Sequence, residues 1–274
     1  MIIPQELLCH INVAYPQSNI TPFEEWLTQQ TLPELERVFI PIHITSFHVN
    51  NSYGQDPQSI KLLQDFFDSL DRSKKYWMVF QYDDGLLIDT KDLDIVTFGM
   101  SYRLPEQKPT YELPLIGQME DKLEIEKTCT ASFIGSMTHP LRQKMMDRLR
   151  FENGYAVSAN FIPYCLYTEM LASSIFSLCP IGYGKTSFRH YESIHQGSIP
   201  VVIFEDELME PYGIDINEYG VKIHESAIDL IPEILASISP YAIEQKRKRM
   251  KELYPVLCTY EGVFSRIIKT LQNE

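Results

Sequence analysis

One stretch, Phe176 to Val202, restricts the possible folds of this chain more than any other. Its sequence, FSLCPIGYGKTSFRHYESIHQGSIPVV, predicts a buried strand that ends at Pro180, a glycine turn, a polar helix over 187–195 and a second buried strand after Gly197. A strand, a helix and a strand in this order are typical of half of a nucleotide-binding α/β unit.

The glycine turn in this stretch predicts a site for an anion. Gly182 and Gly184 allow the backbone to approach a ligand closely. Thr186 and Ser187 are good helix caps, so the free N–H groups and the positive end of the helix dipole face the turn. A phosphate group suits that position.

Two charged residues of the predicted helix, Arg189 and Glu192, are three positions apart and therefore share one face. A permanent cation can hold a diphosphate, and a carboxylate can accept hydrogen bonds from ribose hydroxyls. The alternative is an ordinary ion pair on a solvated helix, worth well under about 1 kcal/mol. The glycine turn and the buried strands on both sides favour ligand contact.

The tripeptide Gly184-Lys185-Thr186 imitates part of a P-loop, and Asp206 imitates the acidic residue that follows a later strand. A P-loop also requires a glycine five positions before Gly184, and Cys179 stands there. Without that glycine the cradle of backbone N–H groups is not specified. A P-loop NTPase is thus the least favoured reading.

Apolar runs alternate with helical patterns along the chain, which predicts parallel sheets with crossover helices. Strand patterns cover 37–44, 76–82, 93–98, 130–134 and 219–223 in addition to the opening stretch. Helical patterns cover 59–70, the segment that carries Leu141, Met145 and Leu149, and segments that begin near Ser226 and Tyr241.

Residues 103–122 contain three prolines and little periodicity, so we interpret them as a linker or crossover. We therefore predict two domains, over 1–122 and 123–274. The last helix is free to pack back on the first domain. A cleft at the ends of both sheets would hold the ligands.

The composition excludes one class of partner. The chain has 274 residues, a formal net charge of −13 and no basic stripe, so we expect no nucleic-acid partner. No run approaches the roughly 18 apolar residues of a membrane span, and we expect no transmembrane segment. Five cysteines without CxxC spacing indicate a reducing compartment. We expect a cytoplasmic protein, with peripheral membrane association left open.

Asp83-Asp84-Gly85 follows an apolar strand, so two carboxylates project at the carboxyl edge of the first sheet. An Asp-Gly turn needs no function to explain it. Adjacent carboxylates in a cleft can, however, raise one another's pKa and supply a general base. Asp83 and Asp84 are accordingly the candidate catalytic residues.

Histidine spacing does not predict a metal site. His190 and His195 are five apart on a helix, which separates them by about 140° around its axis. His43 and His48 lie on or after a strand with no third ligand in view. We expect no metal and no cofactor, and His43 remains a candidate cleft residue.

The opening stretch resembles the signature of the exostosin family of glycosyltransferases, in which a strand ending in Pro and a glycine turn lead into S-x-R-x-x-E and then G-x-I-P-V. The matching residues are Pro180, Gly182, Ser187, Arg189, Glu192, Gly197, Ile199, Pro200 and Val201. Phe133-Ile134-Gly135 with Arg142 resembles the start of the same domain. The segments Ile40-Pro41, Lys75-Tyr76 and 81–85 resemble the shorter bacterial and viral members.

The resemblance implies a GT-B fold, with two Rossmann-like domains whose parallel sheets face a central cleft. It makes 1–122 the acceptor-side domain and 123–274 the nucleotide-sugar-binding domain. It implies inverting, metal-independent transfer of a sugar from a UDP- or GDP-linked donor to a saccharide or glycan acceptor. The implied donor-binding residues are Gly135, Arg142, Gly182, Tyr183, Gly184, Lys185, Thr186, Ser187, Arg189 and Glu192.

One position departs from the family pattern, because many members carry Arg directly after the strand's Pro and this chain has Ile181. Neutralisation of the diphosphate would then depend more on Arg189, Lys185 and the helix N-terminus. A non-catalytic nucleotide-sugar-binding subunit remains the principal alternative function, ahead of the P-loop-like NTPase.

Overall fold

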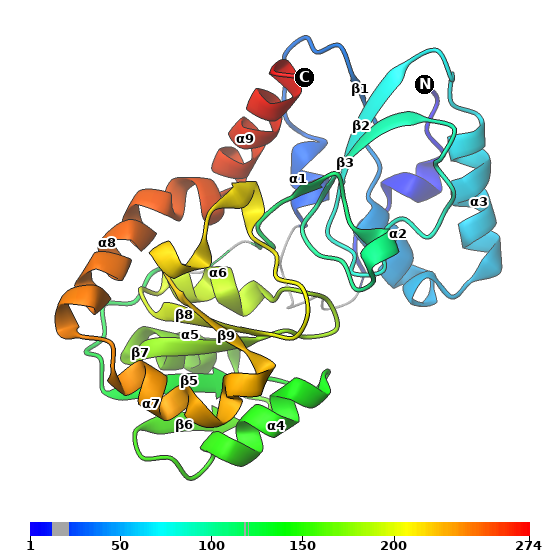
Figure 1. The fold of residues 1–274 in the computed structure, drawn as a ribbon. Helices are drawn as coiled ribbons and strands as arrows, with labels where there is room; N and C mark the ends of the chain where they lie inside the picture. Colours follow the sequence, from blue (N-terminus) through cyan, green and yellow to red (C-terminus); the bar gives the residue numbers. More distant parts are fainter. Residues whose placement is uncertain (13–21, 118, 120) are drawn as a thin grey trace. The chain divides into compact units, whose positions relative to one another are not determined.

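The structure is a computed structural model that describes residues 1–12, 22–117, 119 and 121–274 (Figure 1). The chain divides into two compact units. The first comprises Met1–Gln118 and Tyr260–Glu274, and the second comprises Met119–Thr259. The final helix, α9 (Tyr260–Gln272), thereby belongs to the first unit.

The first unit contains a four-stranded sheet in the order β1-β2-β3-β4, with all pairings parallel. Its strands are β1 (Val38–Phe39), β2 (Lys75–Phe80), β3 (Asp94–Gly99) and β4 (Tyr111–Glu112). Its α-helices are α1 (Phe23–Leu27), α2 (Ile44–Asn50), α3 (Pro57–Asp68) and α9. Three short 3-10 segments are Gln5–Leu8, Ser52–Gly54 and Pro105–Gln107.

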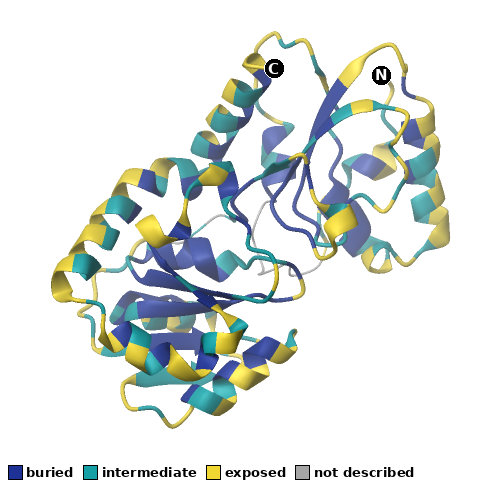
Figure 2. Cartoon of the chain, viewed as in Figure 1, coloured by how far each residue is buried: buried dark blue, intermediate teal, exposed yellow. Residues whose placement is uncertain are grey.

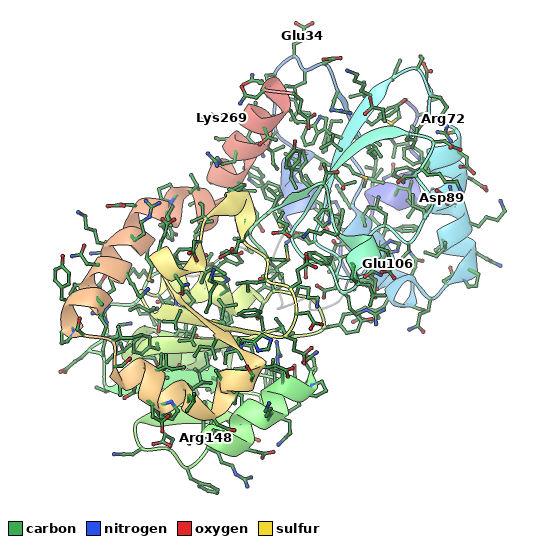
Figure 3. All side chains as sticks on the ribbon, in the orientation of Figure 1. Glu34, Arg72, Asp89, Glu106, Arg148 and Lys269 are labelled. Atoms are coloured by element: carbon green, nitrogen blue, oxygen red, sulfur yellow. The ribbon has the colours of Figure 1, made fainter. Side chains whose placement is uncertain are left out.

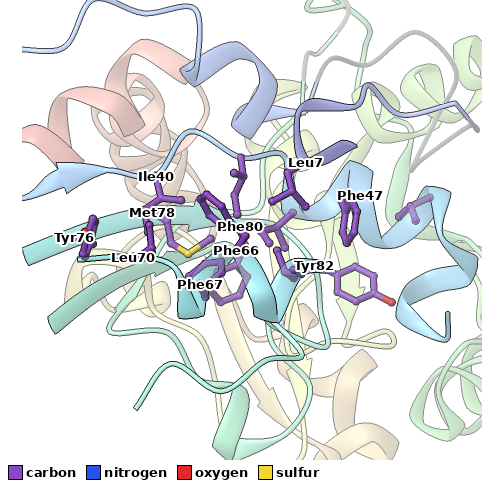
Figure 4. Packing of buried hydrophobic residues seen from close by; sticks show 14 residues of the cluster. Leu7, Ile40, Phe47, Phe66, Phe67, Leu70, Tyr76, Met78, Phe80 and Tyr82 are labelled. Carbon is purple, nitrogen blue, oxygen red and sulfur yellow. The ribbon is translucent and has the colours of Figure 1, made fainter. Parts of the chain in front are cut away.

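The core of the first unit forms around strand β2, whose residues after Lys75 are all buried. Helix α3 contributes Leu63, Phe66 and Phe67, which recur at helical spacing and pack with Met78 and Phe80 of the strand in one cluster (Figure 4). Figure 2 shows exposed residues on the outer face of α3, whereas most of β2 is buried.

The first unit corrects three predicted boundaries. The strand predicted over 37–44 is only β1, because Pro41 has no N–H to donate to a sheet ladder and the chain turns into α2 soon after it. The linker predicted over 103–122 includes β4, which pairs in parallel with β3. Helix α3 begins two residues before the predicted Ser59, where Asp56 accepts hydrogen bonds from the backbone N–H of Gln58 and Ser59.

Helix α9 packs against α1 through aromatic rings. The ring of Tyr260 lies 5.2 Å from that of Phe23 and 5.3 Å from that of Trp26, measured between centroids. Arg37 Nε donates to Glu274 Oε2 at 2.7 Å. Each edge-to-face or tilted aromatic pair stabilises the fold by about 0.5–1.5 kcal/mol beyond the burial of apolar area. These contacts therefore hold the C-terminal helix to its unit.

The second unit contains a five-stranded parallel sheet in the order β6-β5-β7-β8-β9. Its strands are β5 (Cys129–Ile134), β6 (Tyr155–Ser158), β7 (Ser174–Pro180), β8 (Ile199–Phe204) and β9 (Val221–His224). Its α-helices are α4 (Pro140–Leu149), α5 (Tyr164–Ser173), α6 (Phe188–His195), α7 (Ile231–Ala236) and α8 (Pro240–Leu257). Its 3-10 segments are Pro211–Gly213, Ile216–Glu218 and Glu225–Leu230.

The strand order places a topological switch point between β5 and β7. From β5 the chain passes through α4 to β6 on one side, and from β6 it returns through α5 to β7 on the other side. Ligands of open α/β sheets bind at the carboxyl ends of strands at such a point. The sequence predicted β5, α4, β7, α6, β8 and β9, but not β6 or α5.

Charged side chains occupy the periphery of each unit, as the labelled Arg72, Asp89 and Arg148 illustrate (Figure 3). No single helix in the described part of the chain is long and apolar enough to cross a membrane. The helical segments Glu225–Ala236 and Pro240–Leu257 meet that criterion only when taken together, and they are bent by 106°.

Candidate functional site

A buried arginine lies at the switch point of the second sheet. Arg189, in the first turn of α6, is 7% exposed, and its Nη2 donates to the carbonyl of Ile134 at the end of β5. The guanidinium carbon lies 4.6 Å from the ring centroid of Phe133 and 5.2 Å from that of Tyr167. These are cation–π distances, so two aromatic rings position the cation.

Two donors of this guanidinium are unused by the described residues. Nε and Nη1 of Arg189 are buried and have no hydrogen-bond partner there. A buried donor without a partner costs free energy, and more so in a charged group. An anion at the site would supply the missing acceptors.

A second buried arginine lies beside the first. Arg142, from the first turn of α4, donates from Nε to the carbonyl of Ile181 at 3.0 Å and from Nη1 to that of Ser136 at 2.8 Å. It is 7% exposed, and its guanidinium carbon lies 5.8 Å from the ring centroid of Phe133. Two permanent cations therefore share this aromatic ring at the carboxyl ends of β5 and β7.

Two predicted glycines make room for these arginines. A Cβ at Gly135 would lie 2.7 Å from Arg189 Nη2, and a Cβ at Gly182 would lie 2.6 Å from Arg142 Nη2. Real Cβ atoms do not approach so closely. Close approach of a ligand is the prediction at Gly182, and the group that the structure places against this glycine is the guanidinium of Arg142.

Glu192 lies one turn after Arg189 on α6 and is 8% exposed. Its Oε2 accepts a hydrogen bond of 2.5 Å from the hydroxyl of Tyr167. Burial and the neighbouring Glu192 carboxylate raise the pKa of Tyr167 well above its ordinary value, so the phenol remains a donor. The shared helix face was predicted correctly, and the burial of both residues excludes the solvated surface pair.

The remaining residues predicted to bind the nucleotide-sugar donor form the turn between β7 and α6. The backbone N–H of Gly182 donates to the carbonyl of Gly184 at 3.2 Å. Tyr183 is half exposed, whereas Lys185, Thr186 and Ser187 are partly buried. Ser187 occupies the N-cap position with extended backbone, as predicted, but its side chain makes no capping hydrogen bond.

The candidate catalytic residues lie in the first unit, in a turn after β2. Asp84 Oδ1 accepts a hydrogen bond from Arg103 Nε at 2.7 Å, in an ion pair whose arginine is 41% exposed. Asp84 also lines a cavity of about 650 Å³, together with Gln64, Leu87, Thr97 and Lys108, whereas Asp83 is not among its lining residues. The turn closes at Gly85, whose φ of +69° favours glycine.

Sequence reasoning missed a partly buried polar cluster at the start of the first unit. Glu25 Oε2 contacts His10 Nδ1 at 2.5 Å, and His43 Nδ1 contacts the carbonyl of Cys9 at 2.9 Å. Burial lowers the pKa of His43, so this histidine is neutral at pH 7. These residues come from three distant segments, and no local spacing connects them.

Histidines in the second unit have structural partners. His190 Nε2 lies 3.1 Å from the hydroxyl of Tyr219, and burial lowers the pKa of His190 to about 3. His195 Nδ1 lies 2.8 Å from the hydroxyl of Tyr254. The two rings therefore serve separate contacts and do not converge.

The chain forms two α/β units with parallel sheets, and the second unit holds a cationic site at a topological switch point. This is the two-domain α/β class that the sequence predicted as GT-B. The family model of the exostosin GT47 domain matches residues 95–238, more than half of the chain. The chain belongs to the exostosin GT47 family, and the resemblance noted from its sequence is confirmed.

Curated relatives match over part of their length. An exostosin-1 homolog of Caenorhabditis elegans is 36% identical over 90 residues, which are 32% of this chain and 23% of the relative. The probable β-1,4-xylosyltransferase IRX10L of Arabidopsis thaliana is 34% identical over 84 residues, or 30% of this chain and 20% of the relative. A probable glucuronosyltransferase of Oryza sativa subsp. japonica is 34% identical over 117 residues, which are 39% of this chain and 28% of the relative. The matches thus span about a quarter of these relatives' length.

Among solved structures, TarM is similar at a TM-score of 0.43 and 7% identity, covering 78% of this chain and 58% of TarM. The GtfA/B complex is similar at a TM-score of 0.38 and 10% identity, covering 72% of this chain and 46% of the matched chain.

Proposed function

We propose that this protein is a glycosyltransferase that moves a sugar from a nucleotide-diphosphate sugar to a saccharide or glycan acceptor. The observation that carries the proposal is a pair of buried nitrogens on Arg189 that have no hydrogen-bond partner among the described residues, beside a second buried arginine at the switch point. Membership of the exostosin GT47 family supports the reaction class, since relatives are named xylosyl- and glucuronosyltransferases.

The donor diphosphate binds at the turn from Gly182 to Ser187. Nε and Nη1 of Arg189 donate to its oxygens, and Arg142 and Lys185 add positive charge. The N-terminus of α6 contributes its free N–H groups and the positive end of its dipole. Fixed donors aimed at charge that develops on the leaving group stabilise a transition state, so a divalent ion at the diphosphate is not required.

Glu192 accepts hydrogen bonds from the ribose hydroxyls. A carboxylate offers about four lone-pair sites, so the hydrogen bond from Tyr167 is compatible with this role. Tyr167 then acts as a positioning residue, because it also packs against the guanidinium of Arg189. The nucleoside base and the sugar are recognised outside this cluster.

An acceptor hydroxyl attacks the anomeric carbon from the face opposite the diphosphate. The new carbon–oxygen bond forms as the bond to the phosphate oxygen breaks, the leaving diphosphate takes the bonding electron pair, and the configuration inverts. Asp83, or Asp84 in its place, accepts the hydroxyl proton. If Asp84 acts, its ion pair with Arg103 must open or rearrange.

Donor binding is tested by calorimetry with UDP, GDP, ADP and their sugar conjugates, in the presence of magnesium and then of EDTA. We expect one nucleotide series to bind equally under both conditions, and Arg189→Ala to weaken it by at least about 100-fold, as for the loss of a buried charge partner. Arg150→Ala, which removes an exposed arginine at the end of α4, is the matched control. Intact donor binding by Arg189→Ala would refute the assignment.

Catalysis is tested separately by sugar transfer and donor hydrolysis. Asp83→Asn or Asp84→Asn should abolish turnover and leave donor binding unchanged. If both variants turn over normally, the base is another residue. Donor binding without any turnover in the wild type would favour the non-catalytic binding subunit. Magnesium-dependent binding of ATP or GTP, without preference for sugar conjugates, would favour the NTPase.

A further inference from the structure

Two histidines and a glutamate meet in the first unit, from three separate segments. Donor atoms of His10, Glu25 and His43 all lie within 4.8 Å of one another. His10 precedes α1, Glu25 lies within α1, and His43 is the residue before α2. Imidazole nitrogens and a carboxylate oxygen are the ligands that zinc and similar divalent transition metals prefer in proteins.

Surrounding groups hold the glutamate in place. Glu25 Oε1 accepts hydrogen bonds from Ser46 Oγ at 2.5 Å and from the backbone N–H of Ile11 at 3.1 Å. Its Oε2 is the oxygen that faces His10 Nδ1. One carboxylate oxygen is therefore fixed by the protein while the other points to the histidine, as ligating carboxylates are in turn held by hydrogen bonds.

The hydrogen bonds of His43 leave the lone pair of its Nε2 available to a ligand. In the neutral ring, Nδ1–H donates to the carbonyl of Cys9, which leaves Nε2 as an acceptor. The hydroxyl of Thr28 lies 3.1 Å from Nε2, but it has a single hydrogen and also lies 2.9 Å from the carbonyl of Glu25. A histidine that donates its other N–H to a backbone carbonyl has the tautomer and orientation of a metal ligand.

We propose that His10, Glu25 and His43 bind a divalent transition-metal ion of the zinc class. Three protein ligands leave one coordination position for water. The ion would join the N-terminal segment to α1 and to the start of α2, and so stabilise the first unit. The proposed diphosphate ligands all belong to the second unit, so this site is tested without a donor.

The test measures Zn²⁺ binding by calorimetry on the whole protein, freed of metal with a chelator and kept reduced. We expect one Zn²⁺ per chain, a higher unfolding temperature with Zn²⁺, and no binding of Mg²⁺, which prefers oxygen ligands. His10→Ala should weaken Zn²⁺ binding by more than about 100-fold, beyond the effect of losing a group that only orients a ligand. The His10 side chain is 73% exposed, so this variant should fold.

Two further variants keep the proposal open to refutation. Glu25→Gln retains the size of the side chain and should also lose Zn²⁺ affinity. His224→Ala removes another exposed histidine and should bind Zn²⁺ as the wild type does. A wild type that binds no Zn²⁺, or equal binding by His10→Ala and Glu25→Gln, would overturn the proposal and leave a hydrogen-bonded cluster only. Because nucleotide is absent, neither result bears on the glycosyltransferase proposal.

Discussion

Each unit buries an ionisable side chain near its sheet, and the two side chains differ in how many of their hydrogen-bonding atoms have a partner. In the first unit, Glu24 is 2% exposed and accepts hydrogen bonds from the hydroxyl and backbone N–H of Thr45 and from the backbone N–H of Gln81. In the second unit, Arg189 is 7% exposed and has two nitrogens without partners among the described residues.

This difference separates Glu24, which has a structural role, from Arg189, which can bind a ligand. The Glu24 carboxylate joins α1 to α2 and to the end of β2, and its acceptors are occupied by the protein itself. The Arg189 guanidinium is positioned by two rings and one carbonyl, yet part of its donor capacity is left over. Buried polar groups are nearly always paired, so the two nitrogens of Arg189 that lack a partner among the described residues are available to a ligand.

The largest expected effect concerns Glu24. Burial raises its pKa from the ordinary 4.5 to about 7, so the folded protein holds this proton more tightly than the unfolded chain. Its contribution to stability is therefore present below about pH 4.5 and is lost as the pH rises through 7. The loss amounts to about 3 kcal/mol of unfolding free energy.

Glu24→Gln cannot ionise, so it should lose less stability than the wild type between pH 5 and 8. Urea unfolding at both pH values measures the difference, and Glu34→Gln, at an exposed glutamate, is the matched control (Figure 3). Parallel stability curves for Glu24→Gln and the wild type would show that the carboxylate is ionised throughout, and that its three donors outweigh burial.

The next prediction concerns the space that Gly135 provides. In Gly135→Ala the new Cβ forces Arg189 Nη2 away from the carbonyl of Ile134. We expect donor affinity to fall by about 30–100-fold, or roughly 2–3 kcal/mol, with unchanged global unfolding. Calorimetry with the donor measures this, and Ser136→Ala is the neighbouring control. An unchanged affinity would mean that Arg189 does not contact the donor.

The sequence predicted that Arg189 and Glu192 share one helix, but it did not predict the polar clusters of the first unit, and the reason is local. Arg189 and Glu192 belong to one short strand–turn–helix stretch, so hydrophobic periodicity and glycine spacing were sufficient to place them together. Tyr167 escaped notice because it comes from α5, which the sequence analysis did not assign. Its contact with Glu192 joins residues 25 positions apart.

The polar clusters of the first unit depend entirely on tertiary contacts. Glu24 meets Gln81 across 57 positions, and His10 and His43 meet through Glu25. No period or spacing in one sequence encodes such a meeting. Proline likewise set the end of β1 more strongly than the apolar pattern did, because Pro41 cannot join the ladder.

A smaller effect is expected from Tyr167→Phe. The variant keeps the ring against Arg189 and removes the hydroxyl that donates to Glu192 Oε2. Donor affinity should fall about tenfold, or about 1.4 kcal/mol, because the carboxylate loses a donor that orients it. Competition calorimetry against the nucleoside diphosphate measures the loss, with Tyr241→Phe at an exposed tyrosine as the control. A loss as large as that of Arg189→Ala would instead indicate that the phenol itself contacts the donor.

The smallest expected effect is that of Arg103→Ala in the first unit. Its ion pair with Asp84 is partly solvent-exposed, and such pairs contribute less than about 1 kcal/mol because water screens them and two side chains lose freedom. Urea unfolding should therefore barely change, as for Lys61→Ala in the exposed pair with Asp65. A loss above about 2 kcal/mol would instead make Arg103 part of the buried polar framework of the first unit. Asp84 would then be a structural charge like Glu24, which leaves Asp83 as the sole candidate base in that turn.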